Sequence, residues 1–274
     1  MKKILLFVAL AFVWSAASAT PLVGDHYKPK WTQLPDMEVA GDTLSMHRSF
    51  GPVVVDDFVS DGRPIAGFHW WGSYFEDAGQ SSNERIVQFE ISFHQNCAAG
   101  STDPACFDPR TGAPYNYSTP KDGTYFSSIF DVEEDFYGTT ADGVDIYEYW
   151  VKVDDSNAPS FLGNTWEEVA GETYWVDFAW NEGQFLVDDT GAQIDTVGDI
   201  WGWAQTNNGG NCIIDCAVMT GVPGGSNPHL GPWDLLPGQD MAFEVITVPE
   251  PGSLALIGLG LLGFGASKIR RAKK

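Results

Sequence analysis

The residues best suited to chemistry in this chain are aromatic, and they are densest in the stretch FHWWGSYF at residues 68–75. In a β-strand, Trp70 and Tyr74 share one face of this stretch, and Trp71 lies on the other. A sugar ring stacks its C–H groups on an aromatic plane, while an indole N–H or a phenol O–H bonds a hydroxyl group. One prediction is therefore a carbohydrate-binding face. The alternative is a central strand that is packed on both faces.

A second aromatic pair lies in the stretch IWGWAQ, where Trp201 and Trp203 fall on one face of a strand. This pair is compatible with a ligand platform and equally with a layer of the core. The candidate glycan-binding residues are Trp70, Trp71, Tyr74, Trp201 and Trp203.

Acidic residues occur in adjacent groups such as Asp56-Asp57 and Glu133-Glu134-Asp135. A glycosidase needs two carboxylates about 5 to 10 Å apart across a cleft, and neither spacing nor context marks out one pair among so many acids. The chain also holds no G-x-S-x-G, no H-E-x-x-H and no phosphate-binding loop. We therefore predict no catalytic residue and a protein that is not an enzyme.

A bound Ca²⁺ is compatible with the composition. The stretch DVEEDFYGTTADGVD at residues 131–145 offers the carboxylate and carbonyl oxygens that Ca²⁺ prefers. It lacks the residue order of an EF-hand loop. The five histidines do not pair at a metal-ligand spacing, so the sequence defines no metal site.

Four cysteines form two close pairs, Cys97 with Cys106 and Cys212 with Cys216. In a secreted chain, such pairs predict two local disulfides. A zinc site or free thiols are the alternative, although no histidines gather near the second pair as a Cys/His zinc site would require.

Secretion is predicted by the N-terminus. Lys2 and Lys3 precede the apolar run 4–14, and Ala17-Ser18-Ala19 follows it. This order of charge, apolar core and small residues is that of a signal peptide, and we predict cleavage after Ala19. The apolar run is too short to favour retention as an anchor.

The segment between the two ends is strongly acidic. Seven of the fifteen Lys and Arg residues lie in residues 1–19 and 249–274, which leaves eight basic residues against 36 acidic ones. Phosphate binding needs clustered Lys and Arg, so nucleic acid is excluded as a partner. The charge favours solubility outside the cell and is compatible with cation binding.

The elements that position these residues are predicted to be mostly β-strands. Apolar and polar residues alternate in 85–94, 144–155 and 173–181. In the second of these, Tyr147 and Tyr149 share a face, and Glu148 and Trp150 share the other. Further strands are predicted at 52–59, 65–75, 124–132, 185–188, 194–203, 217–220 and 241–247. Long loops are expected at 96–122 and 207–232.

About ten short strands predict an all-β protein, a β-sandwich with jelly-roll or Greek-key connections. The predicted organisation is a signal peptide at 1–19, a leader segment at 20–29, the sandwich at 30–248 and a tail at 249–274.

The tail holds an uncharged run at 253–267 that is rich in glycine. As a helix it spans about 22 Å, against a hydrocarbon core of about 30 Å, so it is a poor permanent anchor. Its glycines allow another helix to approach closely. The basic end that follows the run favours the cytoplasmic side. The run thus fits transient membrane contact, with an ordinary C-terminal anchor as the alternative.

The tail closely resembles the PEP-CTERM sorting signal of bacterial surface proteins. The resemblance rests on the triplet Pro249-Glu250-Pro251, the apolar run and the basic residues Lys268, Arg270 and Arg271. It implies recognition by an exosortase, a membrane processing enzyme, from a membrane-inserted precursor. It further implies delivery to the cell surface or to the exopolysaccharide matrix, as in biofilms.

Residues 30–247 are similar to an uncharacterised domain often found before such tails, through stretches that include KWTQLPDM, VVVDDFVSDGRPIAGFHWWGSY and QDMAFEVIT. This similarity implies a secreted β-sandwich and no particular activity. We expect a non-catalytic, acidic sandwich that associates with exopolysaccharide. A purely structural matrix protein and a glycan-active hydrolase are the alternatives.

Overall fold

The structure, a computed structural model, describes the greater part of the predicted sandwich. The described residues are 28–38, 41–45, 52–75, 86, 88–153, 168–180, 186–187, 193–194, 200–207, 210–220 and 231–247. The predicted signal peptide and sorting tail lie outside them. Among the described residues, no helix is long and apolar enough to cross a membrane.

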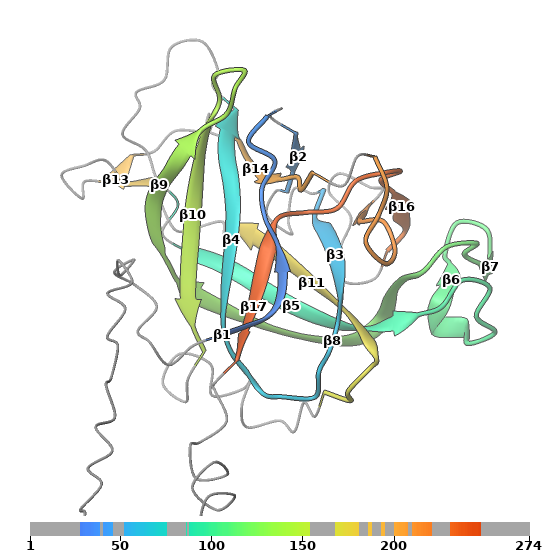
Figure 1. Cartoon of the computed structure of the whole chain (residues 1–274). Coiled ribbons are helices and arrows are strands. Elements are labelled where there is room, and N and C mark those ends of the chain that lie inside the picture. Colours follow the sequence, from blue (N-terminus) through green and yellow to red (C-terminus); the bar gives the residue numbers. More distant parts are fainter. Residues whose placement is uncertain are drawn as a thin grey trace, which may run out of the picture.

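The first of two main layers is a seven-stranded antiparallel sheet built around its longest strand, β4 (Figure 1). One edge of β4 pairs with β10, and the other pairs first with β17 and then with β14. The strands are β1 (Lys28–Gln33), β2 (Asp42–Leu44), β4 (Ile65–Phe75), β9 (Glu133–Thr139), β10 (Asp145–Lys152), β14 (Ile200–Ala204) and β17 (Phe243–Thr247).

The second layer is a six-stranded antiparallel sheet with the order β16-β15-β3-β11-β5-β8. Its strands are β3 (Val54–Val59), β5 (Gln88–Cys97), β8 (Thr119–Asp131), β11 (Thr173–Trp180), β15 (Val218–Thr220) and β16 (Trp233–Leu235). Two short ribbons pair β6 (Phe107–Asp108) with β7 (Ala113–Pro114) and β12 (Leu186–Val187) with β13 (Gln193–Ile194). One turn of 3₁₀-helix, η1, spans Pro104–Cys106.

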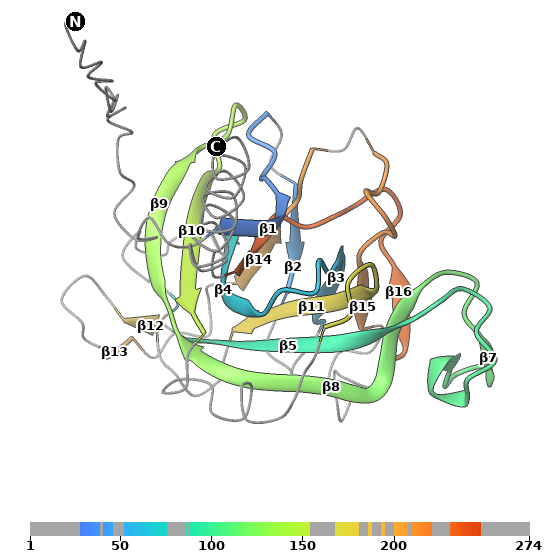
Figure 2. The ribbon, with the colours of Figure 1, turned by 60° about the horizontal axis from the view of Figure 1, so that its bottom comes forward.

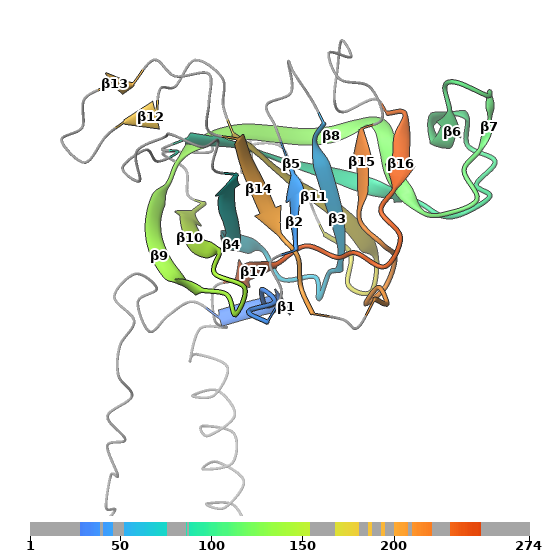
Figure 3. The same cartoon turned by 90° about the horizontal axis from the view of Figure 1, so that it is seen from above.

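The chain crosses directly from one layer to the other between β8 and β9, because Val132 alone separates the two strands. Figure 3 shows this continuous band bending around the side of the molecule from β8 into β9. As a result, β9 is an edge strand of the seven-stranded sheet, with one side paired to β10.

The core lies between the inner faces of the two sheets and is strongly aromatic. Trp70 of β4 stacks on Phe178 of β11 with ring centroids 4.5 Å apart, so the layers meet through these rings. Tyr149 of β10 and Phe89 of β5 complete the contact around Trp70. Burial of large rings is the dominant favourable term in such a core. The all-β class and the sandwich are confirmed.

A second, smaller core covers the outside of the six-stranded sheet, and it corrects one prediction. The alternation in 85–94 predicts that one face of this strand is exposed to solvent, but Glu90, Ser92 and His94 are buried. Tyr115 and Trp233 pack over this side of the sheet. Figure 2 shows the β6–β7 ribbon, which belongs to the same connection as Tyr115, projecting beyond the ends of β5 and β8.

Candidate functional site

Three of the predicted glycan-binding tryptophans belong to the core. Trp70, Trp201 and Trp203 have 0 % of their surface exposed. The indole Nε1 of Trp201 donates to the Tyr149 hydroxyl at 3.1 Å, and that of Trp203 donates to the Ala242 carbonyl at 2.8 Å. Because these rings have no open face, they cannot stack on a sugar, and the alternative of a core layer describes them.

Tyr74 is half-buried, and its hydroxyl is occupied inside the protein. It donates to Glu134, accepts from the Ile86 backbone N–H at 2.8 Å and lies 3.3 Å from the Tyr149 hydroxyl. Burial, followed by the charge of Glu134, raises the pKa of Tyr74 well above its ordinary value. Tyr74 therefore acts as a polar link within the core at this end of the sheet.

Trp71 differs from these residues because it lies on the outer face of the seven-stranded sheet. Its ring is 1 % exposed and packs with Ile146, Ala204 and Ala242 in a small cluster. Among the described residues, its indole N–H has no hydrogen-bond partner. Trp71 thus lies buried directly beneath this outer face, and its indole N–H donor has no acceptor among the described residues.

Strand register builds the candidate site on this outer face. Glu244 of β17, His69 of β4, Trp150 of β10 and Glu133 of β9 lie side by side across four neighbouring strands. Since side chains of directly paired residues point to the same face, these four share the outer surface.

His69 is the centre of the site. Its ring stacks on Trp150, with centroids 3.4 Å apart and an angle of 13° between the planes. Glu148 Oε2 lies 2.9 Å from Nε2, and Glu244 Oε2 lies 3.1 Å from Nδ1. The two carboxyl groups therefore contact the ring from opposite sides and fix its orientation. The half-buried Trp150 is therefore held flat on a fixed ring.

Tyr137 and two acids complete the rim. Tyr137 is 41 % exposed and meets Trp71 edge to face at 5.7 Å. Burial and the charges of Glu148 and Glu244 raise its pKa. Glu133 and Asp135 are exposed and lie opposite Trp150 and Glu148 in the register. We call the surface formed by His69, Glu133, Asp135, Tyr137, Glu148, Trp150 and Glu244 the Trp150 face.

The Trp150 face presents a fixed aromatic plane beside several carboxylates. An aromatic plane of this kind stacks on the C–H face of a sugar. Carboxylates accept strong hydrogen bonds from hydroxyl groups. The arrangement is thus able to bind a polar ring by stacking on one side and by hydrogen bonding at its edge.

A separate group of carboxyls is buried around the middle of β3. Asp56, Asp57 and Asp240 are at most 1 % exposed. Asp56 Oδ2 accepts from the Met241 N–H at 2.7 Å, and Asp240 Oδ2 accepts from the Ile213 N–H at 2.6 Å. Burial, followed by nearby acids, raises the pKa of Asp57 to about 8 and raises that of Asp56 well above its ordinary value. The carboxyls of Asp56 and Asp57 therefore favour their neutral forms, which suits an interior position.

The segment considered for Ca²⁺, 131–145, forms β9, a turn and β10. Successive residues of a strand point to opposite faces, so Glu133 and Asp135 face outward while Glu134 bonds Tyr74. These acids do not converge. Within the described ranges, no group of three or more His, Cys, Asp or Glu residues could hold a metal ion.

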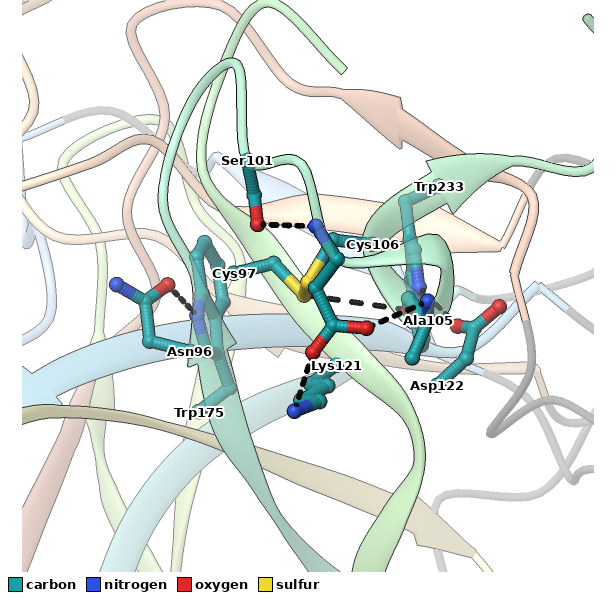
Figure 4. The surroundings of a disulfide bond; sticks show 10 residues. Asn96, Cys97, Ser101, Ala105, Cys106, Lys121, Asp122, Trp175 and Trp233 are labelled. Carbon is teal, nitrogen blue, oxygen red and sulfur yellow. Dashed lines mark hydrogen bonds and ion pairs between the residues drawn. A yellow bond between two sulfur atoms is a disulfide. The ribbon is translucent and has the colours of Figure 1, made fainter. Parts of the chain in front are cut away.

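Both predicted disulfides are present, Cys97–Cys106 and Cys212–Cys216. The first joins the end of β5 to η1 (Figure 4). Around it, Asn96 accepts from the Trp175 indole at 2.8 Å and Asp122 from the Trp233 indole at 3.1 Å. The bridge therefore ties the long 96–122 connection to the tryptophans that it covers.

Comparison with known families assigns the chain in two parts. Residues 29–246 match the model of a domain of unknown function, DUF7901. The chain belongs to this family. The match extends over the sandwich described above, in agreement with the similarity inferred for residues 30–247. No curated protein and no solved structure matches the chain.

Residues 247–271 that follow the DUF7901 domain match the PEP-CTERM protein-sorting motif. This confirms the family resemblance of the tail. The motif implies an exported protein that is sorted to the cell surface and processed by an exosortase. The predicted sorting residues Pro249, Glu250, Pro251, Lys268, Arg270 and Arg271 all fall within the match, although their structure lies outside the described residues, as does that of Ala17 and Ala19.

Sequence reasoning missed the central residues of the Trp150 face in the DUF7901 domain. The signal was present in 145–152, where Trp150 interrupts the polar face formed by Glu148 and Lys152. Glu244 carries no such signal, because its approach to His69 depends on the pairing of β17 with β4.

Proposed function

We propose that this exported protein associates with exopolysaccharide through the Trp150 face and does not catalyse a reaction. The observation that carries the proposal is Trp150, a half-buried ring fixed flat on His69 and bordered by acids. Preformed aromatic planes of this kind bind sugars with little loss of side-chain entropy. The sorting tail supports the proposal, because it directs the protein to the cell surface, where exopolysaccharide is found.

The absence of catalysis is part of the proposal, and the contacts of the two inner acids support it. Glu148 and Glu244 bond the same imidazole ring from its two sides. A glycosidase instead directs two carboxylates at one glycosidic bond across a cleft. Here the pair is engaged in holding His69 in place.

For the precursor, we propose temporary membrane insertion through the apolar run 253–267. Its length, about 22 Å as a helix, and its glycines favour a segment that is released by processing over a permanent anchor.

A second candidate function is that of a structural matrix protein without a ligand. The burial of six tryptophans favours it, since all six serve the interior. They are Trp70, Trp71, Trp175, Trp201, Trp203 and Trp233. The half-buried Trp150 distinguishes the two functions, because a structural protein does not need it.

The test is affinity electrophoresis through gels that contain exopolysaccharide from the producing cells. We expect retardation of the exported protein, loss of retardation in Trp150→Ala and partial recovery in Trp150→Phe, which keeps a ring. The matched control is Phe136→Ala. Phe136 is 59 % exposed on the neighbouring strand β9 but packs against Tyr147, on the opposite face.

Circular dichroism of each variant establishes that it is folded. If Trp150→Ala is retarded as strongly as the unchanged protein, the Trp150 face is not the binding site. If the unchanged protein is not retarded at all, the structural function replaces our proposal.

A further inference from the structure

Acidic side chains outnumber basic ones around Trp150, and this excess of negative charge affects which polysaccharides the face can bind. Four carboxylates border the ring, those of Glu133, Asp135, Glu148 and Glu244. Facing them on the same surface are His69, which bonds two of the four, and Lys152, two residues along β10 from Trp150. At least two carboxylates, those of Glu133 and Asp135, are exposed beside the stacking plane.

An acidic rim of this kind discriminates between sugars by their charge. Uronic acids carry carboxylates, which the rim repels, and the whole chain has a net charge of −22. Neutral hexoses carry no charged group that could pair with these carboxylates. An amino sugar with a free amine carries a protonated nitrogen on the ring that stacks, so it gains both the aromatic contact and a charge-assisted hydrogen bond.

An unused donor beneath the surface is an independent sign of a ligand with oxygen atoms. Trp71 lies between His69 and Ser73 on this face, its ring centroid is 3.9 Å from that of His69, and its indole N–H has no partner among the described residues. A buried donor without an acceptor destabilises the folded protein. Because the donor is buried, a water molecule beneath a bound sugar, and not the sugar itself, would satisfy it.

From these observations we propose that the Trp150 face prefers polysaccharides of amino sugars whose amines are free and protonated. The inference rests on the proposed function and specifies its ligand. The stacking of the ring on Trp150 supplies contact area, and Glu133 and Asp135 pair with the ammonium groups of the same or the next sugar unit.

Calorimetric titration of the purified exported protein tests this preference. The probes are glucosamine oligomers with free amines, their fully N-acetylated counterparts of equal length and linkage, and uronic acid oligomers. At a pH that protonates the amines and at low salt, we expect the affinity to be at least about tenfold higher for the free amines than for the acetylated oligomers, which corresponds to about 1.4 kcal/mol.

Matched variants separate this site from general attraction to an acidic protein. Glu133→Gln should weaken binding of the free-amine oligomers about two- to fivefold, as expected for one exposed ion pair. Glu172→Gln removes the same charge from an exposed position in the turn before β11 of the other sheet and should leave the affinity unchanged.

Equal affinity for acetylated and free-amine oligomers, lost in Trp150→Ala, would overturn the amine preference and leave the proposed function in place. Equal weakening by the two Glu→Gln variants would also overturn the preference, since it would show attraction to the whole surface. Failure of all three probes to bind, together with no retardation in exopolysaccharide gels, would contradict the proposed function itself.

Discussion

Asp57 is a residue whose acidity departs far from its usual value in water. It is 1 % exposed and has Asp215 and Asp240 nearby, and its pKa rises from 3.8 to about 8. The folded state therefore holds this proton while the unfolded chain releases it. The stability that the neutral form provides is complete below pH 4 and is lost as the pH rises toward 8.

Replacing Asp57 by Asn tests this residue, because the amide has nearly the shape of the neutral acid and does not ionise. We expect a higher thermal midpoint than the unchanged protein at pH 7.5 and a smaller difference at pH 4.5. Each kcal/mol corresponds to about 2–4 °C in a domain of this size. The exposed Asp131→Asn is the control. Parallel pH profiles for the unchanged protein and Asp57→Asn would show that Asp57 ionises normally.

Residue types alone predicted carbohydrate binding by aromatic rings, but three of the five residues that the sequence offered, Trp70, Trp201 and Trp203, are buried in the core. The sequence cannot separate Trp70 from Trp71 by composition, and it marks Trp201 and Trp203 only as a pair on one face. Which side of a strand is covered depends on distant segments. Tyr149 receives the Trp201 indole N–H from another strand, and no local pattern contains this contact.

At the scale of elements, periodicity predicted the strands well, because strands such as 65–75 and 145–152 have an alternation that matches a half-buried sheet. Periodicity failed where other segments pack on both faces of a strand. The sequence of β5 predicts one exposed face, yet that face is buried by the connection that holds Cys97–Cys106 and by the segment around Trp233. It also missed β9, whose sequence EEDFYGT is mostly exposed.

The two disulfides should contribute unequally to stability. Cys97 and Cys106 are 9 residues apart, and Cys212 and Cys216 are 4 apart. On the chain-entropy estimate, closing the longer loop is worth roughly 2.7 kcal/mol and the shorter roughly 2.1 kcal/mol. Paired Cys→Ala variants, compared by urea denaturation, should therefore both lose stability, with the larger loss for Cys97 and Cys106.

The first pair also anchors the cover over Trp175 and Trp233, which adds to this difference. The intact mass of the unchanged protein should be higher with reductant than without it by the mass of about four hydrogen atoms, two for each disulfide. A larger loss of stability in the Cys212/Cys216 variant would contradict the role of the longer connection as a cover.

At the scale of the whole molecule, sorting and the proposed binding belong to separate segments. The PEP-CTERM motif occupies residues 247–271, and the Trp150 face belongs to the sandwich. Deleting 249–274 should therefore change where the protein accumulates, from the cell surface to the compartment reached by export alone. Fractionation followed by immunoblotting measures this. Unchanged surface distribution and unchanged tail processing would contradict the sorting function.

The deleted protein also provides a control on the sandwich. Because the strands described here all end by Thr247, we expect its exopolysaccharide binding in gels to equal that of the processed protein. Loss of binding would place part of the binding site in the tail.

The most direct measurement of our central claim is the indole N–H region of the NMR spectrum of ¹⁵N-tryptophan-labelled protein during titration with exopolysaccharide fragments. We expect the Trp150 resonance, assigned by its absence in Trp150→Phe, to shift progressively, while those of the core residues Trp70, Trp201 and Trp203 stay in place. A Trp150 resonance that does not move while the fragments bind would contradict the claim that this face holds the polysaccharide.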